Sequence, residues 1–178
     1  MPEHRTVTEI GDEAFSDCNS LLDVQLGSAT EIGMSAFKNC TRLPSITIPN
    51  SVSEIGNNAF QNCTSLADAT IGNSVTEIGG YAFENCLSLS DLTIGSSVTS
   101  IGNNAFQNCK SLAKVTIPNS VISINDNAFN GCAKLADLTI GSSVTKIGQY
   151  AFENCTSLTE VTIPNKWVLC RLLILILS

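Results

Sequence analysis

Apolar and polar residues follow one another along this chain in a pattern that repeats about every 23 residues. An Ala-Phe pair recurs in steps of 22 and then five times 23 residues, with its ring at Phe15, Phe37, Phe60, Phe83, Phe106, Phe129 and Phe152. A Cys follows each Phe by three residues, and an Ile precedes it by five. A fixed period of about 20 to 50 residues is typical of solenoids, in which each unit buries its apolar face against its neighbours. The pattern therefore predicts a stack of similar coils.

Each unit predicts the same succession of short elements. In residues 66–71 apolar side chains alternate with Asp68 and Thr70, which is the pattern of a β-strand with one buried face. A polar turn follows, then a second extended piece such as residues 75–78, and then a Gly that is replaced once, by Asn125. Because Asn tolerates positive φ best after Gly, we expect this Gly column to be left-handed. The remaining Ala-Phe-x-x-Cys stretch has helical or 3₁₀ spacing and predicts a short turn that buries the Phe.

The repeated columns resemble a known family. The stretch Leu112-x-x-Val115-x-Ile117-Pro118-x-Ser120-Val121-x-x-Ile124-x-x-x-Ala128-Phe129-x-x-Cys132 is similar to the BspA-type leucine-rich repeat of bacterial and protozoan surface proteins. This resemblance implies a repeat solenoid, a right-handed leucine-rich-repeat coil with a parallel β-sheet on its concave face and short extended or 3₁₀ segments on its convex side. We expect residues 1–165 to form seven units of 22–23 residues, and residues 166–178 to form an apolar tail.

Charge and terminal sequences narrow the possible partners and locations. Sixteen acidic and nine basic residues give a formal net charge of -7, which repels nucleic acid phosphates, so we expect no nucleic acid partner. The first residues include no apolar stretch that could act as a signal peptide, whereas the family resemblance implies an extracellular or cell-surface location. Residues 168–177, apolar except for Arg171, are too few to span a bilayer, because a helical span needs about 20 apolar residues.

Eight Cys residues suggest a disulfide framework, a metal site or buried thiols. Seven of them occupy one repeat position, so they should stack about 4.8 Å apart with parallel side chains, a geometry that does not suit a disulfide. Structural zinc sites usually contain close pairs such as C-x₂-C, which are missing from this sequence. We therefore expect free buried thiols, no metal and no cofactor. Cys170 lies outside the register and is either an exposed, reactive thiol or, as we expect, a buried residue of the tail.

Candidate catalytic residues are sparse, whereas a candidate binding face is extensive. The single His, His4, lies near the N-terminus, so no Ser-His-Asp or Cys-His set can assemble and we expect no enzymatic activity. Outward strand positions form an acidic row and a Thr row, which can be a solvated face, a ligand-contacting face or a cation site, since carboxylates about 5 Å apart can share a cation. The candidate ligand face comprises Asp68, Thr70, Asp91, Thr93, Lys114, Thr116, Asp137, Thr139, Glu160 and Thr162.

Two functions of different classes fit this sequence. The first is a protein-binding or adhesion module that presents its concave Thr and acidic surface to a protein ligand, and the family resemblance implies a host or matrix protein. The second is a structural scaffold that self-assembles into a homo-oligomer through its uncapped ends and apolar tail. The tail is a lid over the last coil, a self-association patch or sequence outside the repeat frame. Its candidate self-association residues are Trp167, Leu172, Leu173, Ile174, Leu175 and Ile176.

Overall fold

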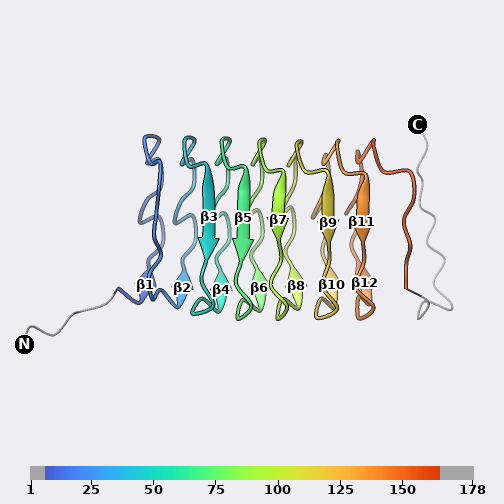
Figure 1. Ribbon diagram of the computed structural model, residues 1–178, viewed down its shortest axis with the longest axis horizontal. Coiled ribbons are helices and arrows are strands. Elements are labelled where there is room, and N and C mark those ends of the chain that lie inside the picture. The colour runs from blue at the N-terminus through green and yellow to red at the C-terminus, as the bar shows by residue number, and fades with distance from the viewer. Residues whose placement is uncertain (1–6, 165–178) are drawn as a thin grey trace, which may run out of the picture.

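The chain winds into a row of stacked coils along the long axis of the molecule (Figure 1). The computed structural model describes residues 7–164. Each coil contains short parallel strands and turns, and no helix occurs in this part of the chain, so none is available there to cross a membrane. The predicted repeat solenoid with parallel strands is confirmed. The predicted tail, residues 166–178, lies outside the described residues, as do His4 and Cys170.

Two sets of parallel strands run along the stack. One set forms a continuous seven-stranded sheet, in the order β1 (Glu9–Ile10), β2 (Glu31–Ile32), β4 (Glu54–Ile55), β6 (Glu77–Ile78), β8 (Ser100–Ile101), β10 (Ser123–Ile124) and β12 (Lys146–Ile147). The other set is divided into a three-stranded sheet, β3 (Ser45–Ile48), β5 (Asp68–Ile71) and β7 (Asp91–Thr93), and a two-stranded sheet, β9 (Lys114–Thr116) and β11 (Asp137–Thr139). We call the outer surface of this second set the strand face; it faces the viewer in Figure 1.

The interior consists of columns of apolar side chains, to which each coil contributes one residue per column. Neighbouring Phe rings stack with centroids 5.1 to 5.4 Å apart and ring planes within 13° of parallel. The five interior rings are completely buried: Phe37, Phe60, Phe83, Phe106 and Phe129. Burial of one such side chain stabilises a fold by about 1.5–3 kcal/mol. The Phe column is therefore a principal source of cohesion between coils.

The Cys column consists of free thiols, as predicted for the described residues. Each buried Sγ donates a hydrogen bond to the Phe carbonyl of the preceding coil, for example from Cys63 to Phe37 over 3.2 Å. Desolvation by burial raises the pKa of the Cys40 thiol to about 11 and the pKa of the Cys63 thiol to about 12. The pKa of Cys86 is raised well above its ordinary value for the same reason. These thiols therefore remain protonated at neutral pH.

The prediction of a left-handed Gly column is wrong. Positive φ occurs two and six residues after that column, as at Asn58 (φ 61°) and Asn62 (φ 60°). Each of these residues is the third residue of a four-residue turn, closed by the hydrogen bonds Ala59 N–H to Gly56 O and Cys63 N–H to Phe60 O. The third position of a type II turn requires positive φ, which Asn tolerates. The predicted helical or 3₁₀ stretch is thus a series of separate turns.

Close approach between coils explains the Gly column instead. A Cβ atom added to Gly56 would lie 2.6 Å from the carbonyl carbon of Gly33 in the preceding coil, and one added to Gly79 would lie 2.6 Å from the corresponding atom of Gly56. Glycine is therefore needed because any side chain would collide with the neighbouring backbone.

Candidate binding surface

The strand face carries the candidate ligand residues in two rows that run along the stack. Strand pairing places Asp68 beside Asp91 and Thr70 beside Thr93. At β9 and β11 it places Lys114 beside Asp137 and Thr116 beside Thr139. Thr162 continues the Thr row through an isolated bridge to Thr139. All ten candidate residues are exposed except Thr70, which is half-buried. The alternation of inward and outward side chains in each strand produces both rows, because successive residues of a strand point to opposite faces.

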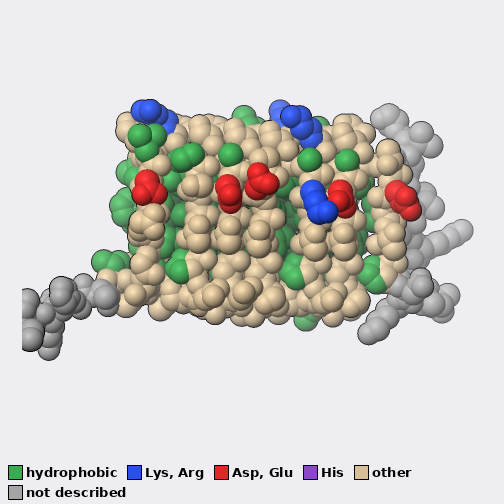
Figure 2. Space-filling model, viewed as in Figure 1, with side chains coloured by type: hydrophobic (Ala, Val, Ile, Leu, Met, Phe, Trp, Pro, Cys, Tyr) green, Lys and Arg blue, Asp and Glu red, His purple; other side chains and the backbone are tan. Residues whose placement is uncertain are grey.

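Carboxylates dominate the first row, as the line of acidic side chains in Figure 2 shows. In order along the stack, the row is Asp23, Ser45, Asp68, Asp91, Lys114, Asp137 and Glu160, so Ser45 and Lys114 interrupt the carboxylates. Lys114 Nζ lies 2.7 Å from Asp137 Oδ2, the one ion pair within residues 7–164. Since both partners are more than half exposed, this pair contributes about 0–1 kcal/mol to stability. The row is therefore a negatively charged surface with little internal neutralisation.

The carboxylates of this row lie at most one per coil along the face. In the described part of the chain, no three His, Cys, Asp or Glu side chains come together in a way that could hold a metal ion. A bound cation needs several oxygen ligands directed at one point.

The strand face has a break that the sequence does not reveal. Backbone pairing is continuous from β3 to β7 and again from β9 to β11, but β7 and β9 belong to separate sheets although they lie next to each other (Figure 1). Lys114, the first residue of β9, lies on the C-terminal side of this break. On the β3–β7 side of the break the charged residues of the row, Asp68 and Asp91, are both acidic, whereas Lys114 and Asp137 on the other side carry opposite charges.

A ladder of Asn side chains joins successive coils on the turn side of the solenoid, and sequence reasoning missed it. The amide nitrogen of Asn62 donates to Asn39 Oδ1 (2.8 Å), that of Asn85 donates to Asn62 Oδ1 (2.9 Å), and that of Asn108 donates to Asn85 Oδ1 (3.0 Å). The ladder stops after Asn108, because the next residue in this column of the repeat is Gly131, which has no side-chain amide. The recurring Asn-Cys dipeptide was a signal that could have indicated it. Such bonds hold neighbouring coils in a constant register.

The fold and its surface define a class of protein. Stacked parallel β-coils with a solvated strand face form a leucine-rich-repeat solenoid, whose coils present outward side chains at regular intervals. The chain belongs to the BspA-type leucine-rich-repeat family, because the model of the BspA type leucine rich repeat region matches residues 2–113 and 76–169 in six copies. Comparison with curated proteins gives no match.

Solved structures of bacterial leucine-rich-repeat proteins share this fold. The T. pallidum leucine-rich-repeat protein TpLRR is 34% identical with a TM-score of 0.81, over 88% of this chain and 73% of its own. A leucine-rich cell surface protein from Faecalibacterium prausnitzii is 31% identical with a TM-score of 0.66, over 85% and 50%. A protein from Eubacterium ventriosum is 27% identical with a TM-score of 0.79, over 94% and 47%. The chain thus spans about half the length of the last two proteins.

Proposed function

We propose that this chain is a protein-binding module of a cell-surface or extracellular protein, and that the strand face is its contact surface. The observation that carries the proposal is the uncovered strand face, on which nine of the ten candidate residues are exposed and strand pairing holds the rows in register. A surface ordered before binding loses little conformational entropy when a partner docks. The cell-surface description of the Faecalibacterium prausnitzii relative supports the location.

The chemistry of the face favours a partner with a basic contact surface. Asp23, Asp68, Asp91 and Glu160 have no cationic partner among the described residues. The ten candidate residues include no aromatic side chain and no Arg, which are the residue types that most often anchor tight interfaces. Binding should therefore depend mainly on charge, with rapid association and a strong response to salt. An adhesion protein that makes many such contacts at a surface gains strength from multivalency.

Capture of proteins from an extracellular-matrix extract on the immobilised full chain tests this proposal. We expect the triple variant Asp68→Ala, Asp91→Ala, Asp137→Ala to capture about tenfold less protein than the wild type. The reason is that the substitutions remove three carboxylates from the contact surface. Capture by the wild type should also fall when the salt concentration is raised.

The second sheet offers a matched control for the loss of negative charge. Glu31, Glu54 and Glu77 are exposed carboxylates outside the strand face, and their triple substitution by Ala changes the net charge by the same amount. This control variant should capture as much protein as the wild type. Undiminished capture by the Asp68, Asp91 and Asp137 variant would exclude the strand face as the contact surface, and an equal loss in both variants would point to net charge alone.

A further inference from the structure

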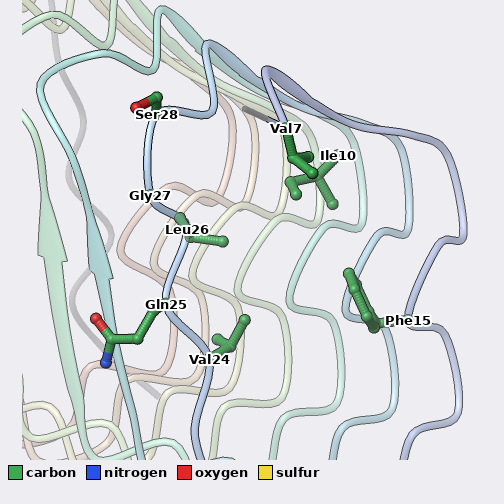
Figure 3. A pocket seen from close by; sticks show the side chains of 8 residues that line it. All are labelled: Val7, Ile10, Phe15, Val24, Gln25, Leu26, Gly27 and Ser28. Carbon is green, nitrogen blue, oxygen red and sulfur yellow. The ribbon is translucent and has the colours of Figure 1, made fainter. Parts of the chain in front are cut away.

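In the first coil that the structure describes, Val7 and Phe15 are exposed at positions that every interior coil buries, whereas Ile10 and Leu26 are buried. Val7, Ile10, Phe15, Val24 and Leu26 line a cavity of about 340 Å³ at the N-terminal end of the stack. Figure 3 shows the Val7, Ile10 and Phe15 side chains on one side of this cavity and Val24 and Leu26 on the other. The Phe15 ring is 37% exposed and Val7 is 66% exposed, whereas the five interior Phe rings are 0% exposed. This surface is one half of the interface that joins consecutive coils inside the molecule.

The hydrogen bonds between coils have a fixed polarity. At one junction Gly33 N–H donates to Ile10 O (2.8 Å) while Phe15 N–H donates to Ala36 O (2.7 Å). The same pair of bonds recurs at the next junction, from Gly56 to Ile32 and from Phe37 to Ala59. Each coil therefore presents different backbone groups to the coil before it and to the coil after it, so only a head-to-tail contact can continue the pattern.

The two ends of the stack offer the complementary halves of this pattern. Gly11 N–H and Ala14 O are the groups that, in interior coils, bond to the preceding coil, and Phe152 N–H and Ile147 O are the groups that bond to the following coil, here in the last coil that the structure describes. Within residues 7–164 none of these four groups bonds to a neighbouring coil. The strands β1 and β12 are the two edges of the seven-stranded sheet. Edge strands are templates for pairing with another chain.

Charge also distinguishes the two ends. Residues 7–91 contain eleven carboxylates and two Lys or Arg side chains, whereas residues 92–164 contain four of each. In the column that runs along the seven-stranded sheet, Glu9 begins the row and Lys146 ends it. A head-to-tail contact would place Lys146 of one copy beside Glu9 of the next. Asp23 would lie beside Glu160 in the same contact, but both are exposed, where solvent and salt screen their repulsion.

We propose that the first described coil of one copy binds the Phe152 coil, the last that the structure describes, of a second copy, head to tail. The Phe152 ring, half-buried in the last coil, stacks on Phe15 of the next copy at the ring spacing of the interior, and the four backbone groups pair as they do between coils. The contact is heterologous, because it joins two different surfaces. It therefore leaves one free end of each kind and extends into linear assemblies. The strand face remains open in such an assembly.

Sedimentation velocity of the full chain over a range of concentrations tests this proposal through charge reversal. Glu9→Lys and Lys146→Glu each place like charges at the junction, so each single variant should associate about two- to tenfold more weakly than the wild type. The double variant should regain association, and so should an equimolar mixture of the two single variants, because each then meets an opposite charge. If the mixture associates no better than its components, Glu9 and Lys146 do not meet and the head-to-tail contact is wrong.

Two variants, each with Asp in place of an exposed apolar residue, test the contribution of the cavity. Val7→Asp places a charge on the end face and should weaken association by about tenfold or more, since an unpaired charge would be buried at the junction. Ile122→Asp is the matched control, because Ile122 is 51% exposed on the flank of the stack, and it should associate like the wild type. A wild-type chain that stays monomeric at every concentration overturns the proposal, as does equal weakening by both variants.

Discussion

At the scale of single residues, the environment of a side chain depends on the coils before and after its own. Phe83 lies between the rings of Phe60 and Phe106 and is fully buried, whereas Phe15 has a ring neighbour on one side and is 37% exposed. The same holds for the thiols. Cys86 is buried between neighbouring coils, so its charged form has no access to water and its pKa is raised.

The raised pKa values of the thiols predict that the protein loses stability at alkaline pH. An unfolded Cys loses its proton near its ordinary pKa of 9.0, whereas Cys40 and Cys155 keep theirs to about 11 and Cys63 to about 12. The folded state thus binds more protons than the unfolded state above pH 9. The free energy of unfolding is unaffected below that pH and falls above it, by about 1.4 kcal/mol per pH unit for each buried thiol.

Urea denaturation at a series of pH values between about 8 and 11 measures this slope. Cys63→Ala removes one buried thiol, so its stability should fall less steeply with pH than that of the wild type. Val75→Ala shortens a buried side chain that does not titrate, and it should lower stability equally at every pH. Parallel slopes for the wild type and Cys63→Ala would contradict the account.

At the scale of elements, contacts between coils determine structure more than local preference does. Strands such as β2 have two residues, and a strand this short has no stability of its own. It persists because β1 and β4 pair with it on both sides. The turns follow the same principle, since Asn58 N–H donates to Gly80 O of the next coil while its positive φ closes a turn in its own coil.

The Gly column provides a prediction at this scale. A Cβ on Gly79 would lie 2.6 Å from the carbonyl carbon of Gly56, so Gly79→Ala must separate two coils and should lower the free energy of unfolding by about 1–3 kcal/mol. Gly11 occupies the same column in the first coil, but a Cβ there would meet no atom within 4 Å. Gly11→Ala should therefore lose no stability in urea denaturation. Equal losses at both positions would show that backbone conformation, and not coil spacing, requires the glycine.

At the scale of the whole molecule, stability is distributed along the stack and has no single centre. An interior coil packs against two neighbours, whereas the coils of Phe15 and Phe152 each have one among the described residues. In repeat proteins, stability is approximately a sum of terms for single repeats and for the interfaces between neighbours. The end coils should therefore open more readily than the middle.

Hydrogen exchange measures this gradient. In the wild-type chain at a concentration low enough to prevent association, we expect the slowest exchange at the amides of Phe60, Phe83 and Phe106, which donate to neighbouring coils over 2.7 to 2.8 Å. Peptides from residues 7–26 and 144–164 should exchange faster. Uniform protection along the chain would mean that all coils unfold as one unit. Protection of the end peptides that rises with protein concentration would agree with head-to-tail contact.

The roles assigned from sequence to particular residues remain predictions. The structure places Asp68, Thr93 and the other candidate ligand residues on one exposed surface, and capture experiments must test what they bind. The domain limit at residue 165 and the self-association of Trp167 and the apolar tail concern residues outside the described part of the chain.

The sequence by itself determined the repeat, the family, the buried columns of Phe and Cys, and the two rows of the strand face. It could do so because period and polarity identify which side of each coil is buried, and because the same position in every unit has the same surroundings. Only the tertiary structure showed that Gly79 is required by the backbone of Gly56, that Asn62 and Asn85 form a ladder, and that strand pairing breaks between β7 and β9. These features depend on distances between neighbouring coils, and the spacing of residues along one chain does not specify those distances.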